Sequence, residues 1–92
     1  MLSHTTNNGP GDAEAMALAA LAATLTDVRR AERFLALPGL SPDGIGASVR
    51  ERSLLAACLG FLEAHEPDLV AVAEAVGVKP EALVAARAEL ER

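Results

Sequence analysis

The chain has 92 residues, which is enough for one domain with one hydrophobic core. Hydrophobic residues make up 51% of it but aromatic residues only 2%, so we expect a core of alanine, leucine and valine. A formal charge of -5 makes nucleic acids and anionic membranes poor partners, and the single cysteine, Cys58, excludes an intramolecular disulfide. Because Cys58 lies in an apolar run, we expect a buried thiol and no nucleophile.

The first eleven residues are polar and place Pro10 between two glycines. They lack the basic and apolar regions of a signal peptide, so we expect residues 1–11 to be a disordered N-terminal tail and residues 12–92 to be a single domain. The longest apolar runs are about half as long as a membrane span requires. The sequence therefore predicts a cytoplasmic protein without membrane contact.

The first predicted helix begins near Asp12, whose side chain can cap it, and runs to about Leu25. No polar residue occurs between Glu14 and Thr24, so this helix is apolar on every side. Such a helix lies either at the centre of a bundle or in an interface. Self-association that buries Ala15, Leu18 and Ala22 would cover the excess apolar surface.

A second helix should follow, with Thr26 as its N-cap and an apolar stripe that reaches about Leu37. Gly39 is the expected stop of this helix, directly after a proline. Pro42 then suits the first position of a short helical turn.

The second half begins with a helix over residues 49–64 that repeats the apolar character of the first helix, so the two should pack together. Two shorter helices are expected over 67–76 and 80–90, with Gly77 at positive φ between them and Pro80 at the start of the second. No stretch shows the alternation of a half-buried strand. The sequence therefore predicts an all-α fold, a compact bundle of five helices plus the short turn.

The second half also repeats the pattern of the first at an offset of 38 residues. Residues 39–45 and 77–83 share a small residue, an aliphatic residue, a proline and an acid in the same order. We therefore expect residues 13–48 and 51–86 to be two fused helical hairpins related by an approximate rotation.

Three stretches resemble a known family in their order and spacing. They are Arg30-x-x-Arg33-Phe34-Leu35-Ala36-Leu37-x-Gly39-Leu40-x-Pro42, Phe61-Leu62-x-Ala64-x-Glu66-Pro67-x-Leu69 and Ala73-x-x-x-Gly77-x-x-Pro80-Glu81-Ala82. The family consists of small bacterial all-helical proteins catalogued only as a domain of unknown function. The resemblance implies a stand-alone helical protein without established activity. Family members encoded near two-component response regulators imply a partner in signalling.

The segment from Asp68 to Leu90 is similar in spacing to a helix-turn-helix, with Gly77 in the turn. A recognition helix needs cations for phosphates, whereas the second helix of this segment carries only Arg87 between acidic residues. We therefore prefer a structural role for this turn. A degenerate helix-turn-helix that binds nucleic acid is the alternative function.

One cluster mixes imidazole with carboxylates, and it comprises Glu63, His65, Glu66 and Asp68. Pro67 interrupts it, and no second histidine or cysteine lies nearby to complete a metal or acid–base site. We expect a solvated corner between helices, with no catalytic residue, metal or cofactor. A small enzyme or ligand-binding protein without a recognisable motif is the second alternative.

Arg29, Arg30 and Arg33 lie close together on the second helix of a chain that is acidic overall. If they form an exposed face, guanidinium groups that pair with carboxylates make it a candidate docking site for an acidic protein surface. A solvated surface without a partner is the alternative. The sequence thus favours a non-enzymatic interaction module whose partner is either itself or another cytoplasmic protein.

Overall fold

The computed structural model describes residues 10–37 and 52–92. These residues form α1 (Pro10–Thr26), α2 (Val28–Leu35), α4 (Arg52–Glu63), α5 (Glu66–Val76) and α6 (Pro80–Leu90). The described ranges contain no strand, which confirms the predicted all-α class. None of the described helices has the length and hydrophobicity needed to cross a membrane. The predicted stop Gly39 and the predicted turn at Pro42 lie outside the described residues.

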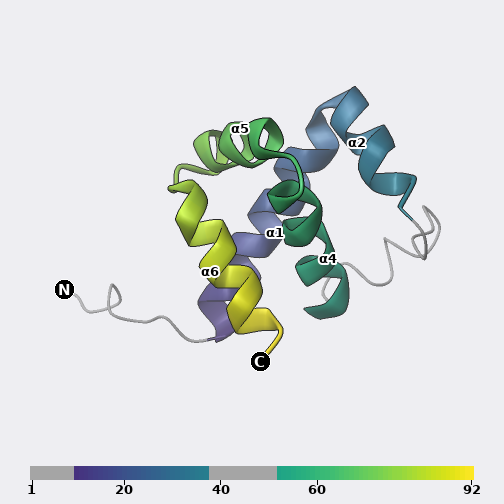
Figure 1. The fold of residues 1–92 in the computed structure, drawn as a ribbon. Helices are drawn as coiled ribbons and strands as arrows, with labels where there is room; N and C mark the ends of the chain where they lie inside the picture. The colour runs from purple at the N-terminus through teal and green to yellow at the C-terminus, as the bar shows by residue number, and fades with distance from the viewer. Residues whose placement is uncertain (1–9, 38–51) are drawn as a thin grey trace.

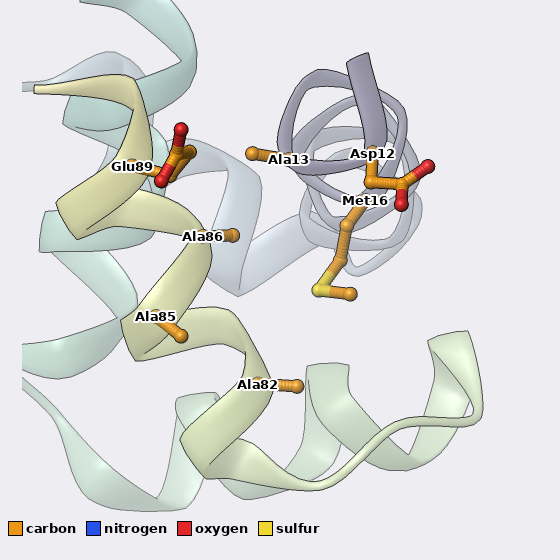
Figure 2. A pocket seen from close by; sticks show the side chains of 7 residues that line it. All are labelled: Asp12, Ala13, Met16, Ala82, Ala85, Ala86 and Glu89. Atoms are coloured by element: carbon orange, nitrogen blue, oxygen red, sulfur yellow. The ribbon is translucent and has the colours of Figure 1, made fainter. Parts of the chain in front are cut away.

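α1 is the central helix of the bundle. It packs against α2, α4, α5 and α6, which are arranged along its length (Figure 1). The predicted contact between the two most apolar helices, α1 and α4, is confirmed. α6 runs beside α1, and Ala13 and Ala86 point into the space between them (Figure 2). α2 packs mainly against α1 and lies at the edge of the bundle.

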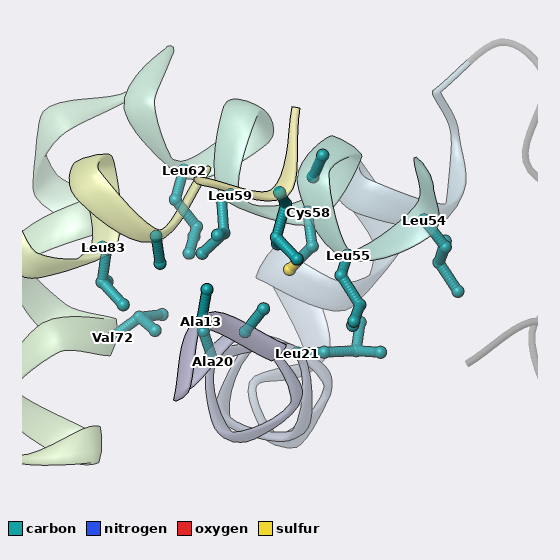
Figure 3. Packing of buried hydrophobic residues seen from close by; sticks show 14 of the residues in the cluster. Ala13, Ala20, Leu21, Leu54, Leu55, Cys58, Leu59, Leu62, Val72 and Leu83 are labelled. Atoms are coloured by element: carbon teal, nitrogen blue, oxygen red, sulfur yellow. The ribbon is translucent and has the colours of Figure 1, made fainter. Parts of the chain in front are cut away.

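The core is built from aliphatic side chains and alanines of all five helices (Figure 3). The largest fully buried apolar side chains are Phe34, Leu21, Leu55, Leu59, Leu62, Leu83 and Val72. A fully buried side chain of this size stabilises the fold by about 1.5–3 kcal/mol relative to exposure. α1 contributes mainly alanines, among them Ala17 and Ala20, which lets neighbouring backbones approach closely.

Two predicted boundaries around α1 change in the structure. α1 begins at Pro10, before the predicted start, because the first turn of a helix tolerates a residue without an N–H. The expectation that Thr26 caps α2 is wrong, since Thr26 still belongs to α1. Asp27 has the extended backbone of an N-cap, and its carboxylate accepts a hydrogen bond from the Arg30 N–H at 2.9 Å.

Two further boundaries shift slightly. α2 ends at Leu35 and does not continue to Leu37. α5 begins at Glu66, just before the predicted start at Pro67, because His65 has the extended backbone of the N-cap.

The junction between α5 and α6 matches the prediction. Gly77 adopts a φ of 90°, a left-handed conformation that costs glycine little. The N–H groups of Gly77 and Val78 donate to the carbonyl oxygen of Ala73 at 2.8 and 2.9 Å, which closes the end of α5. Pro80 occupies the first turn of α6.

Two ion pairs join residues at the repeat offset. Arg52 pairs with Glu14 at 3.3 Å and Arg30 pairs with Asp68 at 3.1 Å, each across 38 positions. Such contacts occur near a rotation axis, where equivalent elements meet. The rotation itself stays a prediction, because the end of the first unit falls in residues 38–51, outside the described ranges.

Candidate functional site

Two of the three candidate docking arginines contact α5. Arg33 donates to both carboxylate oxygens of Asp68, from Nη1 at 2.7 Å and from Nη2 at 3.0 Å, and Arg30 donates from Nε at 3.1 Å. The expectation of an exposed face is therefore wrong for Arg30, whose side chain is only 16% exposed. Arg29 is exposed and forms no ion pair with residues 10–37 or 52–92.

Asp68 is the centre of this arginine cluster and is itself buried. His65 Nδ1 lies 3.0 Å from its Oδ2. The hydrogen bonds from Arg33, followed by those from Arg30 and His65, hold the pKa of Asp68 well below its usual range, although burial opposes this shift. Asp68 is therefore ionised at neutral pH and tethers α2 to α5.

Aromatic contacts support the same cluster. Phe34 of α2 is fully buried, and its ring centroid lies 5.4 Å from that of Phe61 on α4. The Arg33 guanidinium lies 5.6 Å from the Phe61 centroid, within the range of a cation–π contact. Arg33 thus connects α2 to both α4 and α5, which gives it a role in the fold. Whether the arginines also bind a partner stays a prediction.

The polar residues around Pro67 contribute to two different helix contacts. His65 faces Asp68, whereas the Glu63 carboxylate accepts hydrogen bonds from Arg87 of α6 at 2.6 and 3.1 Å. The described part of the chain contains no group of three or more potential metal ligands. The imidazole and the carboxylates near Pro67 therefore do not meet around one point.

Cys58 is fully buried, as predicted. Its Sγ lies 3.6 Å from Thr24 Oγ1, which donates to the carbonyl oxygen of Ala20 at 2.8 Å. Burial raises the pKa of the thiol to about 11. At neutral pH the group is therefore a neutral thiol that packs in the core.

The side of α1 that faces away from the bundle is apolar. Ala15, Ala19, Ala22 and Leu25 are exposed, whereas Leu18 is half-buried and packs against the core. The four exposed residues are three or four positions apart, so they lie along one side of the helix; we call them the α1 seam. No charged side chain occurs in α1 after Glu14, and the seam is therefore uncharged.

A shallow pocket of about 280 Å³ lies between α1 and α6 (Figure 2). Its lining residues are Asp12, Ala13, Met16, Ala82, Ala85, Ala86 and Glu89. The lining is thus mostly apolar and contains two carboxylates and no cation. Glu89 pairs with Arg92 at 3.0 Å, whereas Asp12 forms no ion pair with another described residue.

The sequence likened the segment that contains α5 and α6 to a helix-turn-helix. α6 exposes Glu81 together with apolar residues such as Val84, and the exposed Glu91 follows at its C-cap. The Arg87 guanidinium forms an ion pair with Glu63 and a second one with Glu91 at 3.1 Å. This helix therefore offers few free cations to a phosphate backbone.

Sequence reasoning missed Asp68 as the acceptor for Arg30 and Arg33. One signal could have found it, because Asp68 occupies the position of Arg30 in the repeat register. Equivalent positions of opposite charge are natural contact partners where two copies of a unit meet near their axis.

The comparisons with curated proteins and with solved structures find no match to this chain. A family model for proteins of unknown function, DUF3572, matches residues 10–92. This range includes the five described helices, the arginine cluster and the α1 seam. The chain therefore belongs to the DUF3572 family of proteins of unknown function.

Proposed function

We propose that this protein is a non-enzymatic, cytoplasmic protein–protein interaction module that associates with a second copy of itself through the α1 seam. One observation carries the proposal: α1 packs against the bundle with one side and presents an uncharged, largely exposed line of side chains on the other. Transfer of apolar surface out of water stabilises a complex by about 25 cal/mol per Å² before the costs of association.

The seam itself argues for a second copy as the partner. Three of its four residues are alanines, Ala15, Ala19 and Ala22. In a two-fold pair the same surface supplies both halves of the contact, and small side chains on both copies let the two helices approach closely. The α1 seam can therefore pack against its own copy.

The alternative functions have weaker support. Nucleic-acid binding conflicts with the net charge of -5 and with the acidic surface of α6. Catalysis would need polar groups that converge on a substrate. Asp68 and Glu63, by contrast, are used in ion pairs that hold helices together.

Analytical ultracentrifugation tests the proposal on three proteins over low to high micromolar concentration. The wild type should dimerise. Ala22→Glu should be monomeric, because it places a charge in the middle of the seam. Ala88→Glu is the matched control, since Ala88 is exposed on α6 and the chemical change is identical; it should dimerise as the wild type does. A wild type that stays monomeric at high micromolar concentration would refute the proposal, as would an Ala22→Glu variant that dimerises normally.

A further inference from the structure

We draw no further inference here: the strongest candidate, the shallow pocket between α1 and α6, has two carboxylates in its lining, of which Glu89 already pairs with Arg92, and nothing in the described part of the chain shows what occupies or covers it.

Discussion

Asp68→Asn is the most informative substitution for the fold, because a single carboxylate connects α2 to α5. The side chain keeps its size but loses its charge, and one oxygen becomes an amide that donates hydrogen bonds. Asp68 accepts bonds from Arg33, Arg30 and His65. The NH2 group of the new amide would therefore face at least one arginine donor. Arg30 and Arg33 would also lose the negative charge that balances theirs.

The magnitude follows from the burial of these groups. A hydrogen bond to a charged group contributes about 1.5–3 kcal/mol, but bonds that share one acceptor are not additive. The Arg33 side chain is 47% exposed, so water replaces part of the hydrogen bonding that Arg33 loses in the variant. We expect Asp68→Asn to lower the free energy of unfolding by about 2–3 kcal/mol, a large fraction of the roughly 5–10 kcal/mol that stabilises a domain of this size.

Urea denaturation followed by circular dichroism at neutral pH measures this loss. Asp27→Asn is the matched control: the change is the same, and asparagine caps a helix about as well as aspartate, so its effect should stay within about 0.5 kcal/mol. A loss below about 0.5 kcal/mol in Asp68→Asn would refute the view that the arginine cluster holds α2 in place.

Acidification gives an independent test of the same reasoning. Because the pKa of Asp68 is lower in the folded state than in the unfolded state, its ionised form stabilises the fold above the unfolded pKa of about 4. This stabilisation is lost as the pH falls from there toward and through the folded pKa. The gap between wild type and Asp68→Asn should therefore shrink below about pH 4, and a constant gap would contradict the assignment.

Three further predictions concern the core and the helix ends. Gly77→Val should destabilise by about 1–2 kcal/mol in thermal unfolding through its left-handed backbone alone, since no atom lies within 4 Å of an added Cβ; an unchanged melting temperature would contradict this. Phe34→Ala should cost about 3–5 kcal/mol in urea denaturation because the ring is fully buried against Phe61, and a cost below 1 kcal/mol would show that α2 is held otherwise. The Cys58 thiol should react with a disulfide reagent only as fast as the chain unfolds, and rapid labelling of the native protein would disprove its burial.

Helix positions were predictable where the sequence contains local stop and start signals. The long apolar runs indicated α1 and α4, and Gly77 with Pro80 marked the junction of α5 and α6. These signals act through the backbone of neighbouring residues, so no knowledge of the remaining chain is required. The prediction that Thr26 caps α2 was wrong, because threonine and aspartate can both cap a helix and only the backbone turn selects Asp27.

The sequence by itself determined the helical class, the apolar core and the absence of charge along α1 after Glu14, because these depend on composition and on periodicity within one helix. Only the tertiary structure decided which charges meet. Arg30 and Arg33 look like surface residues in the sequence, yet the packing of α2 beside α5 brings Asp68 within hydrogen-bond distance of both. A contact across 35 or more positions depends on the angle and register of helix packing, and no local pattern encodes these.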